Sequence, residues 1–232
     1  MSVSERNLSH TKWAQSFSIE RNTFTIHKTT HQHMYSKPIQ QLIRAFSKLP
    51  SVGPRTAERF VFHLLKSGKK DVAEITNALK GLIEHIQSCA TCWDFSDESP
   101  CAICANTKRM QHVLCVVKES QELQQLEKTG VFTGRYHVLR GVIKPGNPDS
   151  VKFLKVTELL KRIQDEKITE VILALNPDLS GETTMLYLES EIKKTTPSVI
   201  ISRLARGLPM GSDLQYADEI TLGSALKNRT KS

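Results

Sequence analysis

The sequence lacks both a long hydrophobic run and an apolar leader. No stretch approaches the roughly 18–20 consecutive apolar residues that a membrane-spanning helix requires. The first residues do not show the apolar core of a secretory signal either. Both absences argue against a membrane or exported protein, so we expect a cytoplasmic chain whose cysteines stay reduced.

Cysteine is also scarce, with five among 232 residues, and four of the five lie in one short segment. They form two Cys-x2-Cys pairs, Cys89 with Cys92 and Cys101 with Cys104. A two-residue spacer lets a tight turn aim both thiolates at one point, and two such turns supply the four sulfurs of a tetrahedral zinc site. Because four thiolates leave no open position for water, we predict one structural Zn²⁺ per chain and no chemistry at this site.

Three other interpretations of these cysteines are disulfides, a redox-active pair like that of thioredoxin, and chance. One Cys-x2-Cys pair would leave them open, whereas two pairs at this spacing favour zinc in a reducing compartment. The segment between the pairs contains Pro, Ser and Asp, which form turns, so zinc would replace a core that this segment is too short to build. The fifth cysteine, Cys115, lies in the apolar run Val113–Val117 and is expected to be a buried small side chain.

The composition is that of an ordinary soluble protein, with 39% hydrophobic and 24% charged residues. The length allows one large domain or two to three small ones. A net charge of +8 and a pI of about 9.3 agree with a polyanionic partner, although many basic proteins bind no nucleic acid. The charge therefore supports such a partner only together with a specific site.

The N-terminal segment differs from the rest of the chain. Residues 1–36 are polar and show no helical or strand period, so we expect a disordered extension. They contain four of the eight histidines, including His31 and His33, which leaves a metal site as the alternative. Met34 directly precedes the first ordered pattern, so we interpret it as the true or an alternative start and expect the residues before it to be dispensable.

After this segment, apolar residues recur at helical spacing and predict three amphipathic helices. The first covers about 39–48, the second runs from Pro54 to about 66, and the third carries apolar residues over 72–86. Residues 49–54 interrupt the pattern, and Pro54 suits the first turn of the second helix. The region is therefore expected to be a helical hairpin followed by a third helix that leads to the cysteines.

The connector of this hairpin has the features of a phosphate site. Gly53 allows the backbone to approach another group closely, and the helix that follows presents unpaired N–H groups at its positive end. Arg55 and Arg59 lie one turn apart and could flank a phosphate bound there. Residues 37–80 carry nine Lys and Arg against three Asp and Glu. We predict DNA binding at these three residues; a plain helical hairpin with a solvated basic face is the alternative.

Beyond the cysteines, strand and helix patterns alternate, which predicts a parallel sheet covered by helices on both faces. The chain as a whole is therefore expected to be an α+β multidomain protein: a helical hairpin domain, a small zinc finger and an α/β domain with a mostly parallel sheet. The expected strands cover 113–117, 136–139, 170–175 and 198–202, and the expected helices cover 121–128, 153–164, 181–194 and 221–226.

Two parts of the chain resemble known modules. The stretch Leu49–Ala57 resembles the helix-hairpin-helix motif, which binds DNA backbones without reading sequence, although Ser51 stands where the motif usually has Gly. The α/β part resembles the Toprim domain, whose nucleotidyl-transferring members use a Glu after the first strand and an Asp-x-Asp after a later one. Here Lys118 occupies the place of the Glu, and Asn176 replaces the first Asp. An ammonium group repels the required cation, so we predict a Toprim fold without a working metal centre.

Taken together, Ile39–Arg229 resembles the RecR recombination-mediator family along nearly its whole length. The order of parts matches: hairpin, four-cysteine finger, Toprim domain and C-terminal tail. The departures are Ser51, Lys118, a shortened loop at 144–149 and the extra N-terminal segment. Further matching stretches are 134–139, 168–174, 203–209, 213–219 and 221–222.

The resemblance implies a domain order and a function. It implies a non-enzymatic mediator that binds DNA independently of sequence and works with the RecO and RecF proteins to help load RecA on DNA coated with single-strand-binding protein. It also implies self-association into dimers or ring-like tetramers, partly through the C-terminal region, and a location at the bacterial nucleoid. The expected segments are a disordered extension (1–36), a helix-hairpin-helix domain (37–88), a four-cysteine zinc finger (89–112), a Toprim domain (113–203) and an oligomerisation tail (204–232).

Two other functions remain as alternatives. One is an Mg²⁺-dependent Toprim nuclease or primase that uses Glu119 and Asp178 as metal ligands. The other is a protein scaffold ordered by zinc that makes no direct contact with DNA. In the preferred interpretation, Glu119, Asp178 and Glu182 instead form an acidic surface for a basic partner protein, and zinc fixes the hairpin domain relative to the Toprim sheet.

Overall fold

The computed structural model describes residues 35–229. The expected disordered extension, apart from its last two residues, and the proposed start at Met34 lie outside the described residues. Contacts divide the chain into two units, with the boundary in the sequence between Ala73 and Glu74. This boundary falls inside helix α3 (Lys69–His85), and each unit is described by itself.

The first unit is the predicted helical hairpin. Helix α1 (Lys37–Phe46) packs against α2 (Pro54–Ser67), and the side chains of Ala57 and Val61 are buried between them. The ring of Phe46 meets that of Phe60 edge to face, with centroids 6.0 Å apart. Each helix lies within about three residues of its predicted bounds, because amphipathic spacing is a strong signal.

The connector between α1 and α2 shows how Ser51 is accommodated in the hairpin. Ser51 has φ 63°, in the left-handed region that glycine adopts most readily. The amide of Val52 donates to the carbonyl of Leu49 at 3.1 Å and closes the turn. The backbone thus takes the conformation that glycine would favour, at the steric cost that a side chain incurs there.

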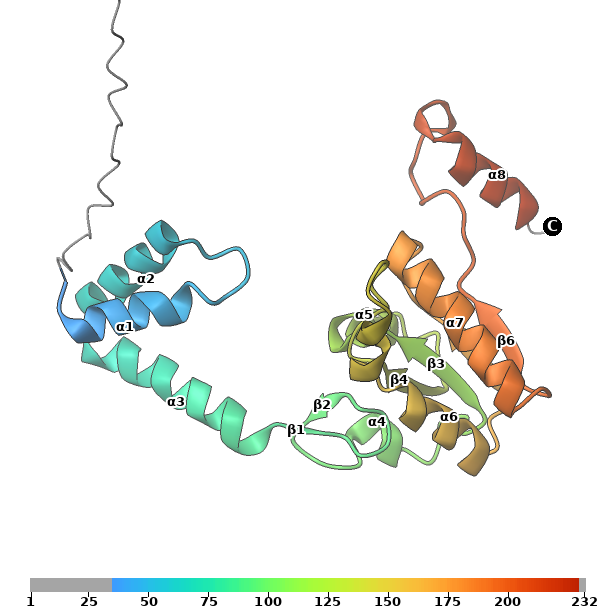
Figure 1. Ribbon diagram of the computed structural model, residues 1–232, viewed down its shortest axis with the longest axis horizontal. Helices are drawn as coiled ribbons and strands as arrows, with labels where there is room; N and C mark the ends of the chain where they lie inside the picture. The colour runs from blue at the N-terminus through green and yellow to red at the C-terminus, as the bar shows by residue number, and fades with distance from the viewer. Residues whose placement is uncertain (1–34, 230–232) are drawn as a thin grey trace, which may run out of the picture. The chain divides into compact units, whose positions relative to one another are not determined.

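The second unit contains a four-stranded sheet in the order β4-β3-β5-β6 (Figure 1). All three strand pairs are parallel, so the sheet is wholly rather than mostly parallel. In the register, Cys115 of β3 lies between Tyr136 of β4 and Ile172 of β5. The strands are β3 (Val113–Val117), β4 (Arg135–Val138), β5 (Glu170–Leu173) and β6 (Ile200–Arg203).

Helices cover both faces of this sheet, as predicted. Successive side chains of a strand point to opposite faces. Leu114 and Val116 therefore join the apolar core that includes side chains of α6 (Val156–Asp165) and α7 (Leu179–Thr195). Cys115 and Val117 join a smaller core with α5 (Ser120–Lys128), and Cys115 is buried as expected. The α/β part of the fold-class prediction is confirmed.

One predicted helix, 153–164, begins in the wrong place. A 3-10 turn (η1, Pro148–Phe153) precedes it, Leu154 is extended, and α6 starts only at Val156. The amide of Lys155 donates to the carbonyl of Leu139 at 2.9 Å, so this segment is tied to the end of β4 instead of continuing a helix. Such a long-range bond leaves no trace in the local apolar pattern.

The C-terminal tail contains a 3-10 turn, η2 (Leu214–Tyr216), and helix α8 (Glu219–Lys227). Asp218 caps α8 and accepts a hydrogen bond from the amide of Thr221 at 2.9 Å. No residue of α8 is buried. Within residues 35–229, none of the helices combines the length and apolar character needed to cross a bilayer.

His137 is a buried titratable group at the centre of β4. Its Nε2 donates to the carbonyl oxygen of Lys155 at 2.8 Å, because a carbonyl can only accept. Burial lowers the pKa of His137 from 6.5 to about 4; the bond to Lys155 opposes this shift, and the charge of Arg162 adds to it.

This depressed pKa predicts an acid-sensitive fold. Between pH 6.5 and about 4, the unfolded chain binds a proton that the folded chain does not, so stability falls as the pH falls. We expect His137 to cost about 2 kcal/mol of unfolding free energy between pH 7 and pH 5. His137→Gln keeps a donor for Lys155 and should remove this loss of unfolding free energy. Urea unfolding at pH 7 and pH 5 measures the loss in both proteins, and an equal loss in the two would contradict the assignment.

Candidate metal centre and surface sites

The zinc-finger segment is built from two turns around very little regular structure. Strands β1 (Gln87–Ser88) and β2 (Phe95–Ser96) pair antiparallel and bring the first cysteine pair into a turn. The short helix α4 (Ala102–Ala105) follows Cys101 and carries Cys104. All four cysteines are buried, although the segment has few apolar side chains of its own.

The geometry of the four sulfurs fits zinc. Their Sγ atoms all lie within 4.8 Å of one another. The Sγ atoms of Cys92 and Cys101 are 3.6 Å apart, far longer than the disulfide bond of about 2.05 Å. A Zn–S distance of about 2.3 Å places two sulfurs of a tetrahedral site about 3.8 Å apart. The cluster therefore has the dimensions of a closed four-thiolate site for one structural zinc ion, as predicted.

The electrostatics of the cluster also favour a bound cation. The neighbouring Cys104 sulfur and burial raise the pKa of Cys92. Burial and the proximity of Cys92 raise the pKa of Cys101 to about 11, although the Cys104 amide opposes this. Burial also acts to raise the pKa of Cys89. Backbone amides, among them that of Cys101, donate to the Cys89 sulfur, and the pKa is lowered to about 6. Four thiolates this close repel one another, and Zn²⁺ offsets that repulsion.

The finger is hydrogen-bonded to the open edge of the sheet. The amide of Val138, in edge strand β4, donates to the carbonyl of Cys92 at 2.8 Å. Arg140 donates through Nε to the carbonyl of Trp93 at 2.6 Å and through a terminal nitrogen to Ser88 Oγ at 2.9 Å. Its guanidinium also lies 3.6 Å from the ring centroid of Phe95. The finger therefore covers an edge that would otherwise expose unpaired backbone groups.

Sequence reasoning missed Arg140 as part of this site. The residue has φ 68°, which is uncommon for a side chain other than Gly, Asn or Asp. Nothing in the local sequence indicates that its partner Ser88 lies 52 positions earlier. Lys155, with Nζ 3.9 Å from the ring centroid of Trp93, is a second contact between finger and α/β domain that no motif predicts.

The predicted DNA-binding residues lie together at the start of α2. Gly53 is the N-cap residue, and no side chain caps this helix end. Arg55 and Arg59 are exposed, and neither takes part in an ion pair formed among residues 35–229. A Cβ at Gly53 would meet no atom within 4 Å, and its φ of −79° is open to any residue.

At the carboxyl edge of the sheet, polar side chains bond to one another and to nearby backbone amides. Lys118 follows β3, and its Nζ lies 3.4 Å from the carboxylate of Glu119. Glu122, in the first turn of α5, accepts hydrogen bonds from the amides of Lys118 at 2.7 Å and Glu119 at 3.3 Å. The other oxygen of Glu122 accepts from the side-chain amide of Asn176 at 3.4 Å. Sequence reasoning missed Glu122, although a Glu three residues after the N-cap is a capping-box pattern.

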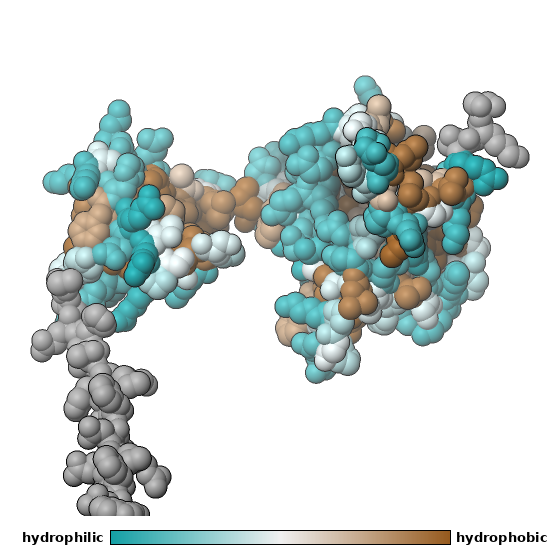
Figure 2. All heavy atoms as spheres, turned by 90° about the horizontal axis from the view of Figure 1, so that it is seen from above, coloured by the Kyte–Doolittle hydropathy of each residue, from teal (hydrophilic) through white to brown (hydrophobic). Residues whose placement is uncertain are grey.

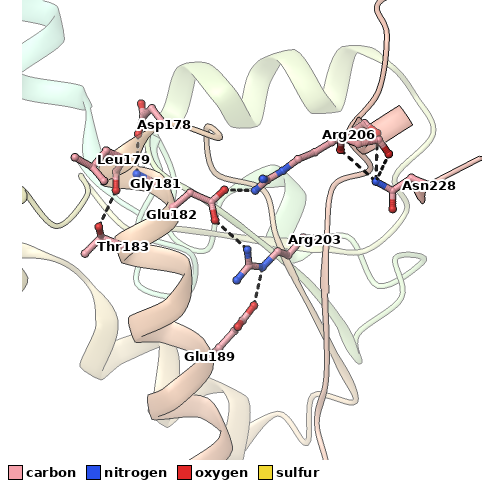
Figure 3. Close-up of polar contacts among 10 residues, drawn as sticks. Asp178, Leu179, Gly181, Glu182, Thr183, Glu189, Arg203, Arg206 and Asn228 are labelled. Carbon is pink, nitrogen blue, oxygen red and sulfur yellow. Dashed lines mark hydrogen bonds and ion pairs between the residues drawn. The ribbon is translucent and has the colours of Figure 1, made fainter. Parts of the chain in front are cut away.

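The loop after β5 is fixed by the start of α7. Asp178 is the N-cap residue, and its carboxylate accepts from the amide of Gly181 at 2.7 Å (Figure 3). A Cβ at Gly181 would lie 1.9 Å from the carbonyl oxygen of Asn176, so only glycine fits there. The carboxylate of Asp178 is thus engaged by the backbone of its own helix.

Glu182 lies one turn further along α7 and is held by arginines of β6 and of the chain that follows it (Figure 3). Its two oxygens pair with Arg206 and, at 3.1 Å, with Arg203. Arg203 also pairs with Glu189 at 2.7 Å. Asp178 and Glu182 are therefore brought onto one helix end, whereas Glu119 lies at the end of the neighbouring strand β3 with its own partner, Lys118.

A hollow of about 340 Å³ lies beside these contacts. Leu173 and Met185 are among the apolar side chains that line it, and Glu122, Asn176 and Arg206 are among the polar ones. It therefore lies outside the carboxyl ends of parallel strands, where such sheets usually bind ligands. Among residues 35–229, however, the only cluster of potential metal ligands is that of the four cysteines.

Comparison with known families accounts for all of these parts. The family model described as "RecR, helix-hairpin-helix" matches residues 39–82, and the model of the RecR four-cysteine zinc finger domain matches 86–106. A "Toprim domain" model matches 112–205, and "RecR, C-terminal" matches 207–230. The chain belongs to the RecR family.

Individual RecR proteins match over most of their length. Recombination protein RecR of Synechococcus sp. (strain CC9605) is 46% identical over 189 residues, which cover 82% of this chain and 97% of that protein. The RecR protein of Anaeromyxobacter sp. (strain Fw109-5) is 41% identical over 83% of this chain and 96% of its own length. The RecR protein of Herpetosiphon aurantiacus is 44% identical over 83% of this chain and 94% of its own length. Membership in a family of recombination proteins is consistent with a role in recombinational repair.

The bond between finger and sheet predicts a distant effect of zinc loss. When a chelator removes zinc, the turn that carries Cys92 should loosen, and the Val138 amide should exchange with deuterium faster. The next amide, Leu139, donates to Val117 inside the sheet and serves as the internal control. Hydrogen exchange with and without chelator measures both.

A matched pair of variants tests the ligand assignment itself. The zinc content of Cys101→Ser should fall well below one ion per chain. That of Cys115→Ser, which removes the cysteine outside the cluster, should stay at one ion per chain. Equal zinc content in the two variants, or an unchanged Val138 amide after chelation, would contradict this account.

Proposed function

We propose that the protein is a recombination mediator that binds DNA independently of sequence. In this role it works with the RecO and RecF proteins to help load RecA on DNA coated with single-strand-binding protein, in the bacterial cytoplasm at the nucleoid. The observation that carries the proposal is the open start of α2, where no side chain caps the helix at Gly53 and where Arg55 and Arg59 form no ion pair within the described part of the chain.

The chemistry of this helix end suits a phosphate. Helix N-termini present amide N–H groups and a partial positive charge to anions. Arg55 and Arg59 add two guanidinium groups one turn apart. Nothing inside the fold requires glycine at position 53, since neither its φ nor a neighbouring atom excludes a side chain, which supports an approach by an external group. Phosphate contacts of this kind carry no sequence information.

The carboxyl edge of the sheet supports a non-enzymatic role. A Toprim enzyme needs carboxylates that are free to hold a cation. Here Lys118 stands beside Glu119, Glu122 is occupied by three donors, and Asp178 caps α7. We keep Glu119, Asp178 and Glu182 as a surface for a basic partner protein, one that would have to compete with the internal partners of these carboxylates.

Self-association is part of the proposal, as a dimer or tetramer. Helix α8 has no buried residue, and Ile220 is 85% exposed. Large apolar side chains exposed without a cover are a feature of interfaces between subunits. Helix α3 exposes a further set at spacings of three and four residues, Val72, Ile75, Leu79, Leu82 and Ile83, and the exposed Ile86 follows directly after the helix.

Removal of the two arginines tests the DNA site. Arg55→Ala/Arg59→Ala should weaken DNA binding at least about tenfold near 0.1 M salt and reduce the slope of log K against log salt by about 1.4–1.8. Fluorescence anisotropy at several salt concentrations measures both quantities. A control variant, Lys128→Ala/Lys193→Ala, loses the same charge from exposed positions of the second unit and should behave like the native protein. A flat salt response of the native protein would favour the scaffold alternative.

The enzyme alternative has its own test. The native protein with Mg²⁺ and DNA or nucleotides should yield no cleaved or extended product above a no-protein blank. Product formation that depends on Mg²⁺ and is lost on Asp178→Ala would overturn the non-enzymatic assignment. Retention of the folded state by Asp178→Ala must be checked by circular dichroism, because this residue also caps α7.

A further inference from the structure

A shallow groove of about 480 Å³ lies on α2, beyond the turn that carries the proposed phosphate site. It is lined by Arg59, Phe60, Phe62, His63 and Lys66. All of these except Phe62 are exposed, and Phe62 is half-buried. In Figure 2 the surface of the helical unit likewise shows apolar groups between hydrophilic ones. No Asp or Glu lines the groove in the described part of the chain.

Cationic and donor groups follow one side of the helix along this groove. Arg55, Arg59, His63 and Lys66 are spaced by four, four and three residues, so they lie on neighbouring turns of the same face. A rise of 1.5 Å per residue separates successive groups by about 4.5–6 Å along the axis. The carboxylate of Glu58, also on α2, accepts a hydrogen bond from the Tyr35 hydroxyl and forms no ion pair with this row among the described residues.

Two aromatic rings flank the row and are held from behind. Phe60 is 44% exposed, and its ring packs edge to face on Phe46, with centroids 6.0 Å apart and planes at 87°. Phe62 packs in the same manner on Tyr35, at 5.1 Å and 63°. A braced aromatic ring between cations offers a base a surface for stacking without a further loss of side-chain freedom.

We propose that this groove is a binding track for single-stranded DNA, in which phosphates contact Arg59 and Lys66 and one unstacked base packs on Phe60. Alternating cations and aromatic rings are the combination that binds single strands without sequence preference. A duplex can use the cations but not the ring, because its bases are already stacked inside the helix. The inference rests on the proposed DNA-binding function and extends it from the hairpin along α2, with a preference for single strands.

The experiment compares an oligothymidine of about 16 nucleotides with a duplex of the same length, both by fluorescence anisotropy on the full chain. Phe60→Leu keeps an apolar contact with Phe46 but removes the stacking surface. It should weaken single-strand binding by about 5- to 150-fold and leave duplex binding within about twofold. Phe60→Tyr, which keeps a ring, should retain single-strand affinity.

Lys66→Gln tests the phosphate contact separately. It should lower the salt slope of single-strand binding by about 0.7, whereas Lys128→Gln on the second unit should leave that slope unchanged. Thermal unfolding and sedimentation of each variant accompany the binding curves. Equal losses on both DNAs together with a smaller assembled mass would make this face an interface between copies of the chain and would overturn the proposal.

The remaining outcomes separate this inference from the proposed function. If Arg55→Ala/Arg59→Ala weakens both DNAs while Phe60→Leu and Lys66→Gln change neither, the hairpin site stands and the single-strand track is refuted. If the native protein binds neither DNA, the proposed DNA-binding function fails as well, and the inference fails with it.

Discussion

Four buried thiols packed within 4.8 Å of one another impose the strongest electrostatic constraint on the second unit. Their sulfurs cannot all ionise unless a cation shares the space, and zinc satisfies that requirement. Zinc also holds the turn whose carbonyls, at Cys92 and Trp93, accept hydrogen bonds from Val138 and Arg140. The edge strand β4 is thus completed by a segment with little core of its own, so metal occupancy and sheet integrity are linked.

The charged side chains at the carboxyl edge of the sheet are paired within the fold, whereas Arg55 and Arg59 at the start of α2 form no ion pair among residues 35–229. At the carboxyl edge of the sheet, Glu122 and Glu182 each bond to groups from separate segments of the chain. An arrangement of this kind holds loops in place and leaves few carboxylate oxygens for a cation. These pairings, together with Lys118 and Asn176 in place of two Toprim carboxylates, support the proposed non-enzymatic role.

The features that the sequence predicts are those that local spacing determines. Strand Val113–Val117 was predicted to the residue because an uninterrupted apolar run is typical of a strand buried on both faces. The metal site was predictable because each cysteine pair has the two-residue spacing of a zinc-binding turn. The break at Leu154 and the role of Arg140 depend instead on bonds to Leu139 and Ser88, and such distant partners leave no periodic signal. The hollow beside Glu122 also arises only when separate strands come together.

The start of α2 combines two features that the fold itself does not need. Gly53 leaves open space where a side chain would fit, and Arg55 and Arg59 are exposed one turn apart. Exposed cations in a row repel one another, and an external anion relieves that repulsion. The braced but exposed ring of Phe60 adds an apolar cost on the same helix. A polyanion that also presents unstacked bases offsets both costs at once, whereas a simple anion offsets only the first.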